Sequence, residues 1–220
     1  MASLTLYGYW RSSSSHRVRI ALALKGIAYE SAIVDLLAGE QFGEEHRRRS
    51  PTGYVPCLSI DGVDYWESVA VVELLEEKFP VPRLYPGDAH ARARIRAMVE
   101  IVNSGTQPMQ NLAVVRHAHA DAEGQKAWSR HFVGRGLRAL ESAIERAEGE
   151  GVHGRFAYGD EPTAADVFLV PQVFAARRYE VDLAPFARVV RAFDAAMKLE
   201  AFQVSAPENQ PDAPKKTEPS

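Results

Sequence analysis

Hydroxyl groups are concentrated in one short stretch of the chain, between two segments whose patterns predict secondary structure. Residues 11–16 read Arg-Ser-Ser-Ser-Ser-His. Residues 4–7 alternate like a short strand, and residues 16–25 place apolar side chains at helical spacing, so we expect the serines at the start of a helix. A helix start carries unpaired N–H groups and partial positive charge, which favour a bound anion. Because serine is also a common cap, the local sequence leaves open whether the run forms an anion-binding pocket or only a cap in a solvated loop.

Serine hydrolysis is poorly supported by the residues around this run. The serines are not part of a Gly-x-Ser-x-Gly elbow, which is typical of one large class of serine hydrolases. His16 is expected inside the helix and is too close in sequence to be an evident base. We therefore do not favour a Ser-His-Asp mechanism.

Two further stretches offer backbone or charged groups to a ligand. If the Val55–Pro56 peptide is cis, the N–H and C=O of Val55 are free to pair with a peptide-like ligand, although a trans proline at a strand start is commoner. Glu67-Ser68 opens a predicted helix, where N–H groups favour a carboxylate and Glu67 favours an ammonium. Together they fit the head group of an α-amino acid, and a plain cap is the alternative. Cys57 is expected to point into the core as a small apolar residue.

The segments that position these residues alternate in type over the N-terminal part of the chain. Asp61-Gly62 lies between two alternating segments, 57–60 and 63–66, and predicts a hairpin. The other predicted elements are strands at 4–7 and 28–34, a short polar helix or loop at 43–49, and helices at 16–25 and 67–79. The order β-α-β-α-β-β-α indicates one mixed sheet with helices on its faces.

Beyond residue 80 the strand signals end. Residues 89–118 favour helix, residues 122–148 and 185–199 are amphipathic, and Thr163-Ala-Ala-Asp166 resembles a capping box. Residues 205–220 are polar and hold four prolines, so we expect an extended or disordered tail. The predicted organisation is an α/β domain at 1–80, a proline-rich linker at 81–88, an all-helical domain at 89–204 and an extended tail at 205–220.

Composition excludes several classes of protein. The 220 residues are 46% hydrophobic and 25% charged, which is ordinary for a globular protein with a full core. With 26 Lys and Arg against 29 Asp and Glu, the chain lacks the positive excess that nucleic-acid binding needs. No apolar run approaches the roughly 20 residues of a membrane span, and no signal pattern is seen. One cysteine excludes a disulfide framework and a multi-cysteine metal site, so we expect a cytoplasmic protein without a metal.

Several motifs together resemble the cytosolic glutathione transferases, and within them the zeta class, in a pattern shared with maleylacetoacetate isomerases. Residues 11–22 resemble the zeta-class signature Ser-Ser-Cys-x-x-Arg-Val-Arg-Ile-Ala-Leu. Further matches are Gln107-Pro-Met-Gln-Asn-Leu112, Leu169-Val-Pro-Gln-Val173, Leu199-Glu-Ala-Phe-Gln-Val-Ser205 and Gln210-Pro-Asp212. The resemblance covers nearly the whole chain. It implies a thioredoxin-like α/β domain followed by an all-α domain, the glutathione transferase fold.

The resemblance also implies that glutathione is the cofactor and assigns roles in holding it. Ser12 would donate its hydroxyl to the glutathione sulfur, and Ser13 and the helix start would add positive potential. Val55 would pair through its backbone with the cysteinyl part. Glu67 and Ser68 would hold the γ-glutamyl end.

Three more residues have implied roles in binding. Gln41 is a candidate near the glycyl end of glutathione. Gln107 matches a family residue that contacts glutathione across the interface of a homodimer. Arg178 matches the family arginine that binds a carboxylate of a small dicarboxylate substrate, with neighbouring Arg177 as a solvated alternative; arginine grips carboxylates bidentately.

Ser14 departs from the family pattern, because the family has cysteine at this position, beside the catalytic serine. A hydroxyl is smaller and less polarizable than a thiol and does not form a thiolate nucleophile. The departure leaves substrate preference and thiol side chemistry open. It need not abolish isomerisation, since the family's reacting sulfur belongs to glutathione.

The implied reaction is the cis–trans isomerisation of maleylacetoacetate to fumarylacetoacetate in tyrosine and phenylalanine breakdown. A thiolate adds to the double bond, the resulting single bond rotates, and the sulfur leaves. Two alternatives remain open at this stage. One is a glutathione transferase that acts on small haloacids or isomerises maleylpyruvate, and the other is a non-catalytic glutathione-binding protein, which only Ser14 supports.

Overall fold

The computed structural model describes residues 3–214, which separate into two compact units. The first unit combines the residues up to Pro82 with those from Glu200 onward, and the second spans Arg83–Leu199. A mixed sheet with helices forms the first unit and helices form the second, so the predicted fold class is confirmed.

Within the residues described up to Pro82, four strands form one mixed sheet in the order β2-β1-β3-β4. β1 (Leu4–Gly8) runs parallel to β2 (Glu30–Ile33) and antiparallel to β3 (Cys57–Ile60). β4 (Val63–Trp66) pairs antiparallel with β3 through the predicted hairpin. Both turn residues have positive φ, 51° at Asp61 and 82° at Gly62, as a type I′ turn requires.

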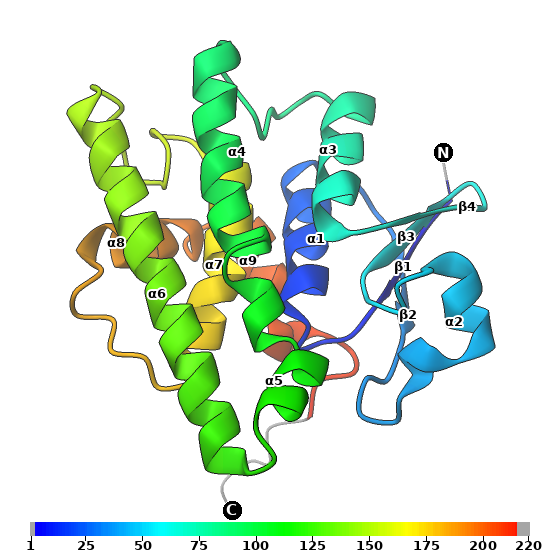
Figure 1. Cartoon of the computed structure of the whole chain (residues 1–220). Helices are drawn as coiled ribbons and strands as arrows, with labels where there is room; N and C mark the ends of the chain where they lie inside the picture. Colours follow the sequence, from blue (N-terminus) through cyan, green and yellow to red (C-terminus); the bar gives the residue numbers. More distant parts are fainter. Residues whose placement is uncertain (1–2, 215–220) are drawn as a thin grey trace, which may run out of the picture. The chain divides into compact units, whose positions relative to one another are not determined.

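Helices cover both sides of this sheet. Figure 1 shows α1 (Ser13–Leu24) and α3 (Ser68–Lys78) side by side against one face, while α2 (Glu44–Arg49) lies on the other side, after a 3-10 turn η1 (Glu40–Phe42). α1 begins at Ser13 rather than at His16 because the serines themselves form its first turn. It is buried almost all round, and Val18, Ile20 and Leu22 are fully inaccessible to solvent.

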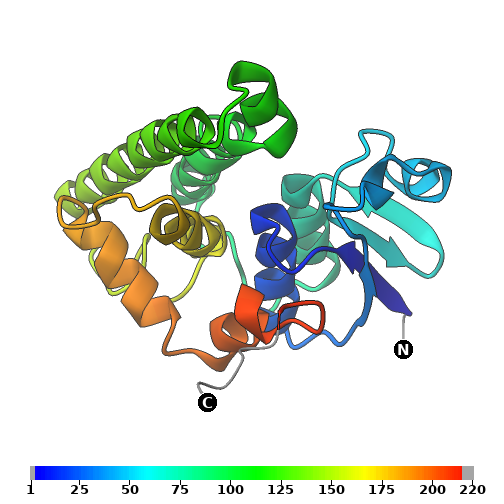
Figure 2. The same cartoon turned by 90° about the horizontal axis from the view of Figure 1, so that it is seen from below.

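The C-terminal segment belongs to the first unit, which differs from the predicted boundary at residue 204. α9 (Glu200–Ser205) packs on α1, with Phe202 fully buried, and a 3-10 turn η3 (Pro207–Asn209) follows. Figure 2 shows this segment, in red, beside α1. The expected extended tail is therefore folded through residues 205–209, and residues 215–220 of that prediction lie outside the described residues.

The second unit is built around α7 (Ala164–Arg178), which packs against α4 (Ala89–Asn103), α6 (Ala122–Gly149) and α8 (Ala187–Ala196). The predicted helical stretch 89–118 is interrupted, because η2 (Gln107–Gln110) separates α4 from α5 (Leu112–Ala118). At this break the Thr106 hydroxyl donates to Ile101 O, near the end of α4, at 2.7 Å. Its side chain fits against Gly136 of α6, where an added Cβ would lie 2.2 Å from Thr106 Oγ1.

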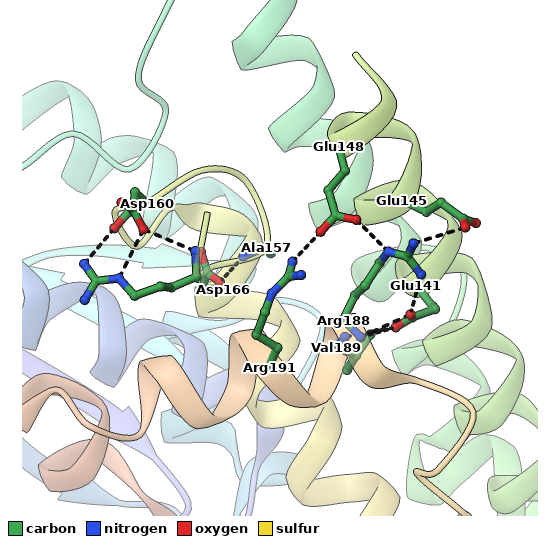
Figure 3. A network of polar contacts seen from close by, with 10 residues as sticks. Glu141, Glu145, Glu148, Ala157, Asp160, Asp166, Arg188, Val189 and Arg191 are labelled. Atoms are coloured by element: carbon green, nitrogen blue, oxygen red, sulfur yellow. Dashed lines mark hydrogen bonds and ion pairs between the residues drawn. The ribbon is translucent and has the colours of Figure 1, made fainter. Parts of the chain in front are cut away.

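Charged side chains tie α8 to α6. Arg188 forms ion pairs with Glu141, Glu145 and Glu148 at 2.7–3.2 Å, and Arg191 pairs with Glu148 at 2.7 Å (Figure 3). The Arg188 guanidinium, hydrogen-bonded to Glu148, lowers the pKa of that carboxyl. The cluster also includes backbone groups, since Glu141 accepts hydrogen bonds from the N–H groups of Arg188 and Val189 at the start of α8.

Among residues 3–214, no helix combines the length and the hydropathy that a bilayer-crossing segment needs.

Candidate functional site

Ser12 caps the helix that the serine run begins. Its backbone is extended, with φ −67° and ψ 117°, and its Oγ accepts the N–H of Ser15 at 3.1 Å. Its carbonyl accepts the N–H of His16 at 2.9 Å. The cap uses a lone pair of Oγ, so the hydroxyl hydrogen of Ser12 stays available as a donor.

The first turn of α1 holds further uncommitted donors. Within residues 3–214, the N–H groups of Ser13 and Ser14 make no hydrogen bond, as is usual at a helix start. Both side chains are half-buried, so they remain accessible to a ligand. These two N–H groups and the Ser12 hydroxyl form a cluster of donors at the positive end of the helix dipole, which suits an anion.

A small apolar cluster connects Val55 to the turn that precedes α1. Tyr9, Val34 and Val55 are buried together, with Trp10 packed against them. The Val55–Pro56 peptide is cis, which was the less common of the two alternatives left open by the sequence. In the described part of the chain, neither the N–H nor the C=O of Val55 forms a hydrogen bond, so both can pair with an extended ligand.

The start of α3 contributes Glu67 and Ser68. Glu67 is exposed and has φ 66°, in the left-handed region that non-glycine residues seldom adopt and that often marks ligand sites. Ser68 is buried, and its Oγ accepts Nη1 of the buried Arg17 at 3.1 Å. Arg17 lies one turn after Ser13 on α1, so this bond brings the two helix starts together.

Arg17 is a further candidate site residue, which the sequence analysis missed. Arg17 belongs to the Arg-Val-Arg motif on which the family resemblance rests, but the sequence around it does not indicate that its side chain contacts Ser68, 51 residues away. A guanidinium beneath the start of α3 adds positive charge where a carboxylate is expected to bind.

Gln41 lies in η1, after β2. Its Oε1 is buried and has no hydrogen-bond partner among the described residues. A buried acceptor without a donor is costly, so this oxygen suits an N–H group brought by a ligand.

His16 and Cys57, which are candidates for a base and a nucleophile in this unit, are both unsuited to the chemistry. Burial, together with the nearby Arg19 and Arg17, lowers the pKa of His16 well below its usual value. Burial raises the pKa of the Cys57 thiol to about 12, and the side chain is fully inaccessible, as predicted. A reactive sulfur at this site must therefore come from a ligand.

The remaining predicted residues lie in the second unit. Gln107 begins η2 and is half-buried, and Arg178 is the last residue of α7 and is exposed. A buried hydrogen bond between two side-chain amides connects η2 and α7, because Gln110 Nε2 donates to Gln172 Oε1 at 3.0 Å. The two motifs that contain these glutamines thus pack together within the helical unit.

Comparison with known proteins gives consistent matches for both units. Residues 11–78 match the family described as "Glutathione S-transferase, N-terminal domain", and residues 116–199 match "Glutathione S-transferase, C-terminal domain". The chain is 44% identical to maleylacetoacetate isomerase of Rattus norvegicus over 211 residues, which cover 95% of this chain and 94% of the rat protein.

Solved structures of related proteins show a similar level of sequence identity to this chain. Maleylacetoacetate isomerase from Anaeromyxobacter dehalogenans, with glutathione bound in the active site, is 49% identical with a TM-score of 0.86, and the match covers 97% of this chain and 99% of that one. A second structure of that enzyme holds dicarboxyethyl glutathione and citrate in the active site, at 48% identity, a TM-score of 0.86 and coverage of 98% and 96%.

Proposed function

Because the chain belongs to the glutathione S-transferase family, we propose that it is a glutathione-dependent cis–trans isomerase that converts maleylacetoacetate to fumarylacetoacetate. Relatives at 44–49% identity over nearly their whole length carry the name maleylacetoacetate isomerase. The structure with bound glutathione supports glutathione as the cofactor. We place the reaction in the breakdown of tyrosine and phenylalanine.

The observation that carries this proposal is the serine-capped start of α1. The Ser12 hydroxyl keeps its hydrogen, and the N–H groups of Ser13 and Ser14 have no hydrogen-bond partner among residues 3–214. When bound, glutathione supplies the nucleophilic sulfur that adds reversibly to the cis double bond. The donors of α1 stabilise that sulfur as a thiolate; lowering a thiol pKa of about 8.5 by two units corresponds to about 2.7 kcal/mol.

The other residues of the first unit would orient the tripeptide. Val55 would pair with the cysteinyl backbone through its N–H and C=O, which have no hydrogen-bond partner within the described part of the chain. Ser68, held by Arg17, offers its hydroxyl and the α3 start to the γ-glutamyl carboxylate, while Glu67 pairs with its ammonium. Gln41 Oε1 can accept an N–H near the glycyl end.

Two residues of the second unit have proposed roles in binding. Arg178 would hold a carboxylate of the dianionic substrate, because its guanidinium is exposed at the end of α7. Citrate in the active site of the Anaeromyxobacter enzyme is consistent with a preference for polycarboxylates. Gln107 would contact glutathione from η2.

We also propose that the protein is a homodimer in the cytoplasm. Two large apolar side chains are exposed after β2 and in η1, since Leu37 is 64% and Phe42 53% accessible. A second copy would cover such side chains. The reducing cytoplasm keeps glutathione in the thiol form that the reaction needs.

An absorbance assay tests the function directly. Purified protein is mixed with maleylacetoacetate, with and without glutathione, and in parallel with maleylpyruvate and a small haloacid. We expect conversion of maleylacetoacetate that requires glutathione and does not consume it. Conversion of only the haloacid, or no conversion at all, would contradict the assignment.

A further inference from the structure

The turn before α1 is held by residues from the other end of the chain. Trp10 N–H donates to Asp212 Oδ2 at 2.8 Å, across 202 residues of sequence. The turn itself is closed by Ser12 N–H, which donates to Tyr9 O at 3.0 Å. The peptide groups that lead into the cap residue are therefore tied to the C-terminal segment, residues 200–214.

Arg19 makes a second connection between the same two segments. It is 4% exposed, and its guanidinium donates to Tyr9 O at 3.4 Å, to Trp10 O at 3.0 Å and to Ser205 O at 3.1 Å. Burial lowers the pKa of Arg19 to about 10, which leaves it charged at neutral pH. One buried cation thus joins two carbonyls of the turn to the end of α9.

The C-terminal segment is itself well anchored. Phe202 is fully buried, Ser205 and Ala206 are nearly so, and Ser205 Oγ donates to Ala201 O at 2.7 Å. Gln210 Nε2 donates to Ala206 O at 2.9 Å and holds the chain that leads to Asp212. The segment is therefore a rigid support for the turn.

We propose that Asp212 is a positioning residue, which fixes the turn Tyr9–Ser12 on the support that Arg19 and α9 provide, so that the Ser12 hydroxyl and the first N–H groups of α1 point at the cofactor sulfur. This inference rests on the proposed function. Asp212 touches neither the cofactor nor the substrate; it acts through the Trp10 peptide. An acceptor at residue 212 holds the turn, and without it the turn has more conformational freedom and the sulfur is less well stabilised.

The test compares three variants of the full-length protein. Asp212→Ala removes the acceptor, Asp212→Asn keeps an oxygen acceptor without the charge, and Glu208→Ala is the matched control. Glu208 is an exposed acid of the same segment, and it forms no hydrogen bond or ion pair in residues 3–214. The readouts are thermal unfolding, glutathione affinity by calorimetry, the pKa of the bound thiol from its ultraviolet absorbance, isomerase kinetics, and amide exchange of residues 9–15.

We expect Asp212→Ala to raise the pKa of the bound thiol by about half a unit to one unit and to lower kcat/KM about tenfold, the size of one charge-assisted hydrogen bond. Amide exchange of the turn should accelerate in the same variant. Asp212→Asn should recover most of both effects, and Glu208→Ala should match the wild type. A structural role alone would lower the unfolding temperature without moving the thiol pKa of the folded fraction.

The proposal is overturned if Asp212→Ala matches Glu208→Ala in thiol pKa and in amide exchange, or if activity falls only in proportion to unfolded protein. If the wild type binds glutathione but does not isomerise maleylacetoacetate, the proposed function fails, while thiol pKa and exchange still decide the role of Asp212. If the wild type binds no glutathione, both proposals fail.

Discussion

Two helix starts in this protein are capped by hydroxyl residues, yet their polar groups are used differently. At α1, in the first unit, the Ser12 side chain accepts one N–H, and the N–H groups of Ser13 and Ser14 have no partner among the described residues. At α7, in the second unit, the cap is closed on itself. Thr163 Oγ1 accepts the N–H of Ala165 at 3.2 Å, and Asp166 accepts both the N–H and the hydroxyl of Thr163.

Burial separates the two sites further. Thr163 and Asp166 are at most 1% exposed, and the other oxygen of Asp166 accepts Ala157 N–H at 2.8 Å (Figure 3). Ser13 and Ser14 are half-buried. The polar groups of the α7 cap are therefore paired within the fold, while the α1 cap leaves donors that we propose for a ligand. The difference between the two caps lies in the pairing of the neighbouring donors, which the cap residue itself does not reveal.

Removal of the Ser12 hydroxyl gives the largest expected effect. Ser12→Ala should lower kcat/KM by about a hundredfold or more, the size seen when one donor to a developing anion is lost, and Ser14→Ala should change it far less. Thr163→Ala is the reciprocal control. It should lower the free energy of unfolding by about 1–2 kcal/mol and leave the activity of the folded enzyme unchanged. Equal small losses in the two serine variants would remove the distinction between the caps.

The two ends of α7 also differ. Its start holds the buried Thr163–Asp166 cap, whereas its last residue, Arg178, is the proposed carboxylate-binding residue. Arg178→Ala should raise KM for the dicarboxylate about tenfold or more, the size of a charged hydrogen bond, with glutathione affinity nearly intact. Arg177→Ala is the matched control, since Arg177 is also exposed and stacks over Phe193 at 4.3 Å. A large loss of glutathione binding in Arg178→Ala would mean that this arginine is misassigned.

The buried cap of α7 contains a titratable group, Asp166, and should therefore make the free energy of unfolding depend on pH, which the serine cap of α1 does not. Burial raises the pKa of Asp166 from 3.8 to about 6. The folded protein thus holds this proton more tightly than the unfolded chain, so the group stabilises the fold fully below its unfolded pKa and loses that contribution as the pH rises through about 6. We expect the unfolding free energy of the wild type, relative to Asp166→Asn, to fall by at most about 3 kcal/mol between about pH 4 and pH 7.

Urea unfolding of the two proteins across that pH range measures the difference. Parallel stability curves for wild type and Asp166→Asn would show that this carboxyl titrates at its ordinary value. The isomerase pH profile of the folded protein should not follow this transition, because Asp166 lies in the structural cap.

The smallest expected effect concerns Ser14, the family departure at the α1 start. Ser14→Cys restores the thiol and should change the ratio of kcat/KM between substrates by a few fold, with little change in glutathione affinity. Competition assays with pairs of dicarboxylates and haloacids measure this ratio. An unchanged ratio would make the departure neutral.

Local patterns in the sequence predicted the elements whose causes are local. The Asp61-Gly62 turn and the Thr163–Asp166 cap depend on neighbouring residues, and both formed as expected. The helical stretch 89–118 was not predicted to break, although Gly105 and Pro108 offered a signal.

Long-range contacts account for what the sequence analysis missed. Arg17 reaches Ser68, and Asp212 reaches Trp10, through the packing of α1 against α3 and α9. The spacing of apolar residues along the sequence predicts helices and strands, but it does not predict contacts between residues so far apart. The motif matches marked the segments as important, but only the fold assigned their contacts. The cofactor and substrate roles of the candidate residues stay predictions.

The central claim is that the start of α1 holds glutathione as a thiolate. It is tested most directly by titrating the ultraviolet thiolate absorbance of glutathione bound to the intact protein, in the wild type and in Ser12→Ala. We predict ionisation about two units below the ordinary thiol pKa of about 8.5 in the wild type, and a return toward that value in the variant. An unshifted pKa in the wild type, or no binding at millimolar glutathione, would contradict the account.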